Sequence, residues 1–396
     1  MPRFEPFHAL RYRRDLPLAD VTAPPYDVLS AADVADLISR HPANIVLVDV
    51  PREEDGPARY DVAAEQLQAW RRDSVLVADE ARTFTLYRMR FTDEAGNRRE
   101  TVGVLGALEV VDDGGDGVLP HERTTPKAKT DRLDLTRATR SNLSPVWGLS
   151  LTAGLTELLT EPAEFVGSFV NEADGVEHIV ERVTDPARLE SIAAAVASTP
   201  VLIADGHHRY AISRTYRDER RAADGDNGSA ELTLTYVSEL VAEQLSIDAI
   251  HRLYNGVTAD ELLATLATSF TFEEAGHVDA SFASQVVERA ALCLVRPDGS
   301  GVWMTPRSDV FADVRALDGA YLEHALAAST ADVGYQHGVE HVVDMVAAGI
   351  ATAGVLIRPT SIVEIRRTAD ERLLMPPKST FFTPKLRTGL VIRPLD

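Results

Sequence analysis

The chain has 396 residues, of which 45% are hydrophobic, with one cysteine and a formal net charge of -21 at pH 7. This acidic balance argues against binding to duplex nucleic acid, because neutralisation of phosphate charge supplies most of that affinity. One cysteine excludes an intramolecular disulfide, no uncharged segment is long enough for a membrane span, and the amino terminus lacks the apolar core of a signal peptide. We therefore expect a cytoplasmic protein of two or three domains.

Helical and strand patterns alternate along the chain. Segments with helical spacing or capping signals are 30–40, 60–72, 189–197, 207–221, 259–268, 281–290 and 339–348. Segments typical of strands are 45–50, 83–91, 101–111, 200–204, 292–296, 301–305 and 389–392. Residues 121–145 are polar and predict a loop, with a short helix after Asp131. Together the patterns predict an α/β or α+β fold of mixed sheets and helices.

Three regions are expected along the chain. An N-terminal α/β region, 1–115, ends in the glycine-rich segment 112–117. The central region, 116–255, contains the segments HERTTPKAKTDR and DGHHR, and the C-terminal α/β region, 256–396, ends with MPPKSTFFTPK. Cys293 stands in the apolar run ALCLV and is expected to be a buried core residue.

The distribution of lysine singles out two segments. Arginine occurs 36 times, whereas the four lysines are Lys127, Lys129, Lys378 and Lys385. Because arginine serves wherever a cation only has to be solvated, these lysines indicate positions that need a compact ammonium, such as a phosphate or carboxylate site. The first segment also contains His121 as a possible base, the carboxylate of Glu122 and the cation Arg132. Chance retention in a structural salt bridge is the alternative.

The segment DGHHR lies between the strand 200–204 and a helix. Gly206 permits a tight turn, and Asp205 is a candidate cap of the helix. Such a turn directs backbone N–H groups and the positive end of the helix dipole at one point, which suits a phosphate. Further side-chain donors come from His207, His208 and Arg209. The alternative is a capped helix with a solvated first turn.

For three other polar residues, the sequence is compatible with either a structural or a functional role. Asp27 follows a stiff Pro-Pro-Tyr entry, Asn142 stands in a predicted turn, and His251 follows an apolar stretch. The segment MPPKSTFFTPK resembles a rigid anion-holding hairpin, although it lacks the glycines of a Walker A loop.

Five segments together resemble a prokaryotic family known only as domain of unknown function 1015. They are APPYDVLS, HERTTPKAKTDRL, NLSPV, ADGHHRY and MPPKSTFFTPKLRTGL. The resemblance covers nearly the whole chain and implies no settled activity. DGHHR itself is similar to the phosphate-binding box of the ParB/sulfiredoxin superfamily, most closely to that of its free serine kinases. This second resemblance implies a strand–turn–helix unit at 205–209 that holds nucleotide phosphates, with Glu122 as a candidate for the glutamate that activates the acceptor hydroxyl.

The first hypothesis is a nucleotide-dependent phosphotransferase that acts on the hydroxyl of a small molecule such as serine. The expected partners are ATP or ADP with Mg²⁺ and the small-molecule substrate. Asp205 and Glu122 are expected to share metal binding and base duty, with His207 and His208 beside them. The phosphates would be held by Gly206, Arg209, Lys127, Lys129, Arg132, Lys378 and Lys385. This hypothesis predicts that the four lysines surround one pocket, with Lys378 within about 15 Å of His207.

Two alternatives belong to other functional classes. A regulatory switch would bind nucleotide, hydrolyse it slowly if at all, and act through a partner protein. A metal-dependent hydrolase would be built from His121, His251 and Asp205, although no short ligand-spacing motif is present. A reductase of the sulfiredoxin type is not favoured, because His207 and His208 stand where a reactive cysteine would be needed. The oligomeric state stays open.

Overall fold

The larger part of the chain is organised around one mixed sheet. The structure, a computed structural model, describes residues 1–93, 96–123, 129–225 and 228–396. These residues divide into two compact units, the first formed by Met1–Asp93, Asn97–Leu245 and Pro384–Asp396, and the second by Ser246–Thr383. Residues 116–245 pack with the N-terminal region, and the C-terminal segment 384–396 packs with the same unit. The two units therefore differ from the three regions expected from the sequence. Those three regions stay a prediction.

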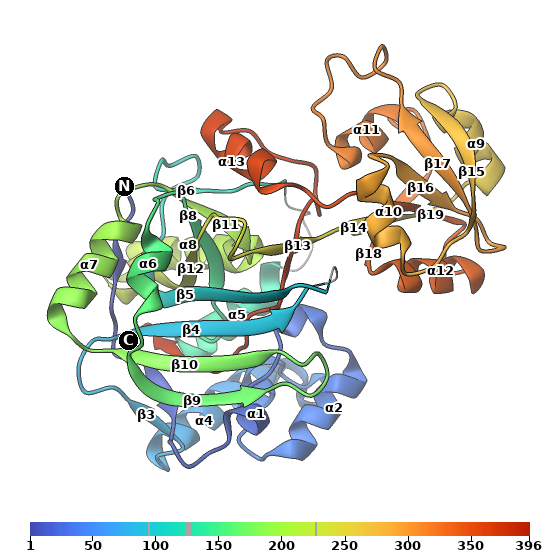
Figure 1. The fold of residues 1–396 in the computed structure, drawn as a ribbon. Coiled ribbons are helices and arrows are strands. Elements are labelled where there is room, and N and C mark those ends of the chain that lie inside the picture. The colour runs from blue at the N-terminus through green and yellow to red at the C-terminus, as the bar shows by residue number, and fades with distance from the viewer. Residues whose placement is uncertain (94–95, 124–128, 226–227) are drawn as a thin grey trace. The chain divides into compact units, whose positions relative to one another are not determined.

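Nine strands of the described residues form the sheet of the first unit (Figure 1). In sheet order they are β6 (Val118–Leu119), β11 (Val201–Asp205), β8 (Val146–Ser150), β12 (Leu232–Glu239), β5 (Arg98–Glu109), β4 (Phe84–Thr92), β10 (Glu177–Val183) and β9 (Glu164–Val170), with β1 (Phe4–Glu5) paired to β5. The pairs β6–β11 and β8–β12 are parallel, and the other pairs are antiparallel. The sheet is therefore mixed, as the sequence predicts.

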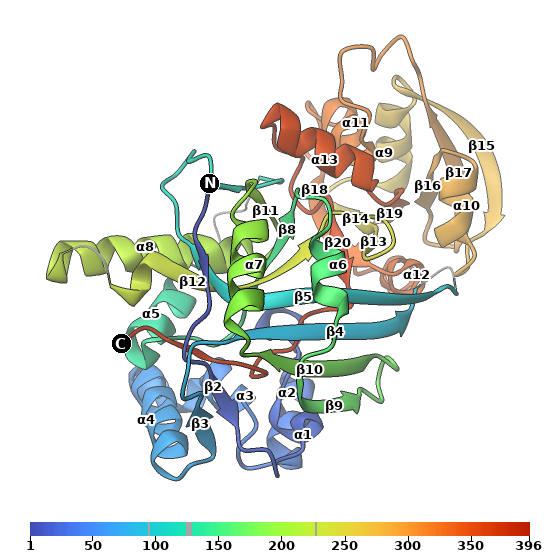
Figure 2. The same ribbon diagram turned by 60° about the vertical axis from the view of Figure 1, so that its left-hand side comes forward.

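Helices surround this sheet (Figures 1 and 2). They are α1 (Leu18–Val21), α2 (Ala31–Arg40), α3 (Val46–Asp49), α4 (Arg59–Arg72), α5 (Lys129–Thr139), α6 (Leu155–Thr160), α7 (Pro186–Val196) and α8 (His207–Asp224). Apolar residues of α6 and α7 pack against the sheet. The helices contribute Leu155, Leu159, Ile192 and Val196 to this core, and the sheet contributes residues that include Phe84, Leu86 and Val104. Two small strand pairs complete the unit, β2 (Leu10–Tyr12) with β3 (Leu76–Ala78) and β7 (Ser141–Asn142) with β21 (Arg393–Pro394).

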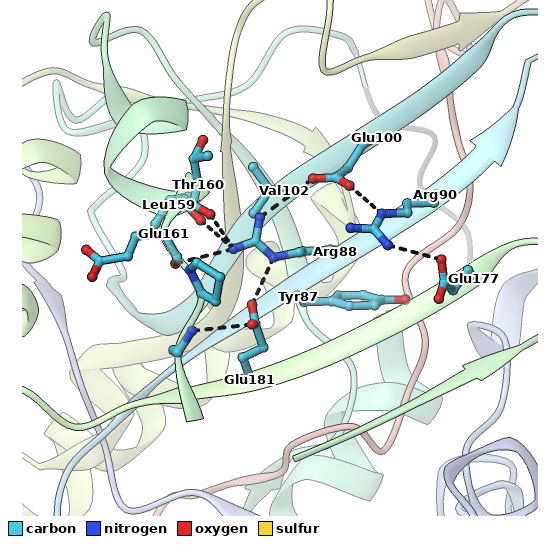
Figure 3. A network of polar contacts seen from close by, with 12 residues as sticks. Tyr87, Arg88, Arg90, Glu100, Val102, Leu159, Thr160, Glu161, Glu177 and Glu181 are labelled. Carbon is cyan, nitrogen blue, oxygen red and sulfur yellow. Dashed lines mark hydrogen bonds and ion pairs between the residues drawn. The ribbon is translucent and has the colours of Figure 1, made fainter. Parts of the chain in front are cut away.

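A buried arginine attaches α6 to the sheet (Figure 3). The Nε of Arg88, on β4, donates to the Glu181 carboxylate on β10 at 2.8 Å. Its Nη2 donates to the C-terminal carbonyls of α6 and the residue after it, at 2.7 Å for Leu159, 3.2 Å for Thr160 and 3.4 Å for Glu161. The last carbonyls of a helix have no partner within it, so a cation placed there stabilises the helix end.

The second unit has a six-stranded sheet among the described residues. Its order is β15 (Phe270–His277), β17 (Ser300–Pro306), β16 (Leu292–Val295), β19 (Ala353–Leu356), β14 (Ile250–Asn255) and β18 (Asp332–His337). Its helices are α9 (Ala259–Leu266), α10 (Phe282–Glu288), α11 (Asp318–Ala325), α12 (Val339–Ala347) and α13 (Ile362–Glu371). A short pair, β13 (Ser246–Asp248) with β20 (Phe381–Thr383), completes it. Cys293 is fully buried here, as predicted, and burial raises the pKa of its thiol to about 12.

Two predicted strands are wrong. Residues 45–50 contain the short helix α3, Val46–Asp49, and not a strand. Asn44 accepts a hydrogen bond from the Val46 N–H at 3.0 Å, at the start of this helix. A short apolar run does not distinguish strand from helix. Residues 389–391 form no strand, and the flanking residues Thr388 and Ile392 make only isolated bridges. Gly389 has a φ of 91°, which interrupts the extended backbone. Within the described residues, no helix combines the length and apolar character needed to cross a membrane.

Candidate functional site

The DGHHR segment forms a strand–turn–helix. Strand β11 ends at Asp205, Gly206 adopts left-handed backbone angles (φ 86°, ψ 28°), and α8 begins at His207. A side chain at 206 would be strained by this φ, and its Cβ would lie 3.0 Å from the Cζ of Arg209. Gly206 is the N-cap and no side chain caps the helix. The prediction that Asp205 caps α8 is therefore wrong, and the N-terminal end of the helix is left to other partners.

Asp205 instead lies between two cations. Its Oδ2 accepts a hydrogen bond from the Arg209 guanidinium at 2.5 Å, and its Oδ1 accepts one from the Lys385 ammonium at 3.3 Å. Burial alone would raise the pKa of Asp205, but the charges of Lys385 and Arg209 outweigh it and hold that pKa well below its ordinary value. A lysine 180 positions away in sequence thus lies at the turn.

The HERTTPKAKTDR segment also reaches this turn. His121 is fully buried, and its Nδ1 is hydrogen-bonded to the carbonyl of Ile203 in β11. Its ring lies 4.8 Å from that of His207, and its Nε2 lies 3.8 Å from the carboxylate of Glu122. The structure therefore places a carboxylate and two imidazoles beside the Gly206 turn, with His208 next to them in the first turn of α8.

The remaining predicted residues are distributed differently. Lys127 lies outside the described residues, and Lys129 begins α5 with a side chain that is not described. Lys378 is exposed in the second unit, where its carbonyl accepts a hydrogen bond from Arg252 at 3.1 Å. The gathering of all four lysines around one pocket stays a prediction.

The metal-dependent hydrolase receives no support from His251. This residue is buried in the second unit, its Nδ1 accepts a hydrogen bond from the Ile357 N–H at 3.2 Å, and burial lowers its pKa to about 3. Among the residues described, no three His, Cys, Asp or Glu side chains are grouped so as to hold a metal ion.

A small polar cavity adjoins Arg209 in the first unit. The volume of this cavity that the centres of water molecules can occupy is about 50 Å³. Its lining comes from Tyr26, Asp49, Arg132, Leu135, Thr136, Ser141, Asn142, Leu143, Ser144, Arg209, Ile212, Ser213 and Thr233. Each of the segments PPYD, HERTTPKAKTDRL, NLSP and DGHHR, or the helix that continues it, contributes to this lining. Four segments selected from the sequence therefore meet around one space.

Asp49 is the buried carboxylate of this cavity. Its side chain is 4% exposed. Arg132 Nη1 lies 3.3 Å from its Oδ1, and the Ser144 hydroxyl lies 3.4 Å from both carboxylate oxygens. The Arg132 guanidinium also stacks over the Tyr26 ring, at 4.2 Å from its centroid. Burial raises the pKa of Asp49, and the charges of Arg132 and Arg209 offset this only in part.

Comparison with known proteins assigns the family. The model of the family described as protein of unknown function (DUF1015) matches residues 4–320. The chain belongs to this family. The matched part of this DUF1015 chain contains four of the five segments and ends before MPPKSTFFTPKLRTGL. Comparison with curated proteins gives no match.

Several solved structures are similar at low identity. A free serine kinase variant in complex with AMP is 13% identical, with a TM-score of 0.37, over 69% of this chain and 89% of that one. A conserved hypothetical protein from Pyrococcus furiosus is 13% identical, with a TM-score of 0.37, over 69% of this chain and 92% of that one. C-terminally truncated SbnI from Staphylococcus aureus is 12% identical, with a TM-score of 0.40, over 73% of this chain and 87% of that one. At these identities and TM-scores, the ligands of those proteins are not evidence for a ligand of the DUF1015 chain.

Sequence reasoning missed Asp49 in the DUF1015 chain. The residue stands in the run IVLVDV, which predicted a strand, so no role was expected for it. The available signal was the carboxylate itself, because an acidic side chain inside an apolar run is costly to bury unless it has partners. Arg132, which was expected to hold phosphate, is engaged with Asp49 and Asp131.

Proposed function

We propose that the protein is a nucleotide-dependent phosphotransferase that acts on the hydroxyl of a small molecule. The observation that carries the proposal is the meeting of three segments at the Gly206 turn, where Asp205 lies against Lys385 and His207 lies against His121. Phosphoryl transfer depends mainly on positioning and on neutralising charge, so it requires cations, helix N–H groups and carboxylates at one point. The similarity of DGHHR to a phosphate-binding box supports the same assignment.

The carboxylates have different duties in this proposal. Asp205 is a poor proton acceptor, because Lys385 and Arg209 hold its pKa low. Glu122 is then the base: it takes the proton of the acceptor hydroxyl as the new oxygen–phosphorus bond forms, and the bond between the terminal phosphoryl group and the rest of the nucleotide breaks. Mg²⁺ is commonly held by one or two carboxylates and the substrate phosphates, and Asp205 would supply such a carboxylate. The ion would neutralise charge on the phosphates.

Titration calorimetry with ATP and with ADP in the presence of Mg²⁺ tests the nucleotide requirement. We expect binding at or below millimolar concentration, and no binding by either nucleotide contradicts the proposal. Lys385→Gln is expected to weaken binding about tenfold, equivalent to about 1.4 kcal/mol. Arg214→Gln is a matched control, because Arg214 lies on α8 but pairs with Asp113, whose side chain is 90% exposed.

Turnover distinguishes the phosphotransferase from a nucleotide switch. A panel of small hydroxyl compounds should accelerate nucleotide consumption by orders of magnitude if the protein is a phosphotransferase. If nucleotide binds but no acceptor changes its consumption, the switch is the better description. Product analysis for a phosphorylated acceptor completes the assignment.

A further inference from the structure

The cavity beside Arg209 contains a buried carboxylate with weak partners. Every contact to the Asp49 carboxylate within the described residues measures 3.3 or 3.4 Å. Charge-assisted hydrogen bonds to carboxylates are usually shorter, at about 2.7–2.9 Å. Because a buried charge is costly unless strong partners satisfy it, Asp49 has capacity for a further donor, and an ammonium or hydroxyl group in the cavity would supply one.

Asn142 contributes the complementary group. Its side-chain oxygen accepts hydrogen bonds from the Leu234 N–H at 3.0 Å and from Arg393 at 3.2 Å. Its Nδ2 makes no hydrogen bond to any residue that the structure describes. Since Asn142 and Arg209 both line the cavity, their N–H groups suit an anionic oxygen atom there.

The size of the cavity limits the ligand. A water molecule needs about 10–15 Å³ by this measure, so 50 Å³ holds roughly three to five water-sized groups. A hexose or a nucleoside is too large for that space. The lining hydroxyls of Ser144, Ser213 and Thr136 add donors and acceptors suited to a small polar molecule.

We propose that this cavity is the acceptor pocket and that it takes a small α-amino acid, with the ammonium group against Asp49 and the carboxylate against Asn142 and Arg209. The inference rests on the proposed phosphotransferase function. Arg209 also contacts Asp205, so the amino acid lies next to the phosphate-binding turn, where a side-chain hydroxyl can receive the phosphoryl group. Asp49 is a positioning residue in this arrangement, and it takes no part in the transfer itself.

Calorimetry on the full chain with a ligand panel tests the chemistry of the pocket. L-serine and L-alanine share the ammonium and the carboxylate, so both should bind, whereas glycerate, which lacks the ammonium, should bind at least about tenfold more weakly. Glycerol and glucose should not bind. Equal binding of glycerol and L-serine would overturn the inference.

Variants test the location of the pocket. Asp49→Asn keeps the shape of the side chain, and we expect it to weaken L-serine binding, and to raise the KM for this acceptor, by about 10–100-fold while nucleotide affinity changes less than twofold. Asp79→Asn is the matched control, because Asp79 is equally buried and paired with an arginine, Arg11. If Asp49→Asn fails to fold, Ser213→Leu fills the cavity without removing a charge and should abolish amino-acid binding.

The outcomes separate the two proposals. If wild-type protein binds no nucleotide but binds L-serine in a manner that depends on Asp49, the phosphotransferase fails and the amino-acid pocket stands. If nucleotide turnover with an acceptor is observed and neither Asp49→Asn nor Ser213→Leu changes its KM, the pocket is refuted and the phosphotransferase stands.

Discussion

The turn at Asp205 gives a quantitative test of its electrostatics through Asp205→Asn. Asparagine keeps the volume and one acceptor oxygen but removes the negative charge that lies between Arg209 and Lys385. The side chains of these cations are only 10% and 18% exposed, so the loss leaves partly buried positive charge without its anion. The variant therefore tests the charge balance at the turn, because Asp205 is not the cap of α8.

The magnitude follows from the two contacts. A hydrogen bond to a charged group contributes about 1.5–3 kcal/mol, and breaking a fully buried pair costs about 3–5 kcal/mol. Asp205 is 27% exposed and asparagine retains one acceptor, so we expect a loss of about 1–3 kcal/mol in the free energy of unfolding. For a unit of this size that lowers Tm by roughly 2–12 °C. Acceptor-dependent turnover should fall by about two to four orders of magnitude if the carboxylate binds the metal ion.

Urea unfolding at several pH values measures this contribution. A carboxylate whose pKa is depressed in the folded state stabilises the protein above its unfolded pKa of about 3.9, and this contribution is lost as pH falls. The difference between wild type and Asp205→Asn should thus be constant from pH 5 to 7 and shrink below about pH 4. Asp112→Asn is the control, because Asp112 pairs with Arg217 at 2.6 Å but is 79% exposed, and we expect less than about 1 kcal/mol. A difference under about 0.5 kcal/mol for Asp205→Asn at pH 7 would refute this reasoning.

Three further variants test other parts of the first unit. Arg88→Met should cost about 3–5 kcal/mol in urea unfolding, because it leaves the Glu181 carboxylate buried, whereas Arg90→Met, at a side chain that is 52% exposed, should cost less than about 1 kcal/mol. Gly206→Ala should cost about 1–2 kcal/mol for the left-handed backbone and weaken nucleotide binding in calorimetry, since the new Cβ displaces the neighbouring guanidinium. For Asp49→Asn, stability relative to wild type should increase as pH rises from about 4 to 7, because the raised pKa makes wild type carry an unfavourable buried charge at higher pH.

The sequence predicted helices and strands well where the interactions that form them join residues close together in the sequence. The capping box of Ser30 and Asp33 begins α2 as expected, because both hydrogen bonds join residues three positions apart. The strands predicted at 83–91 and 101–111 form β4 and β5, which pair with each other. The prediction for 45–50 was wrong because all of its residues except Asp49 are apolar, so that neither a period of two nor one of 3.6 is visible.

The candidate site depends on contacts that no local pattern contains. DGHHR predicted the turn, because a glycine between a strand and a helix is a local feature. Of the two partners of Asp205, Arg209 is four residues away, but Lys385 is 180 positions away and is not visible in the adjacent sequence. Asp49 faces its partners from a short helix far from α5 in sequence, so only the tertiary fold reveals its cavity.

Arg209 occupies a position that suits arginine better than lysine. Its Nη2 donates to Asp205 at the Gly206 turn, while its Nη1 donates to the carbonyl of Pro145. The same side chain lines the Asp49 cavity. A planar guanidinium makes these directed contacts at once, whereas an ammonium is a single point charge on a flexible stem. Lys385 donates to the other oxygen of the same carboxylate, at 3.3 Å. The two cations of Asp205 therefore differ in geometry, because the planar guanidinium of Arg209 also joins the turn to the neighbouring cavity.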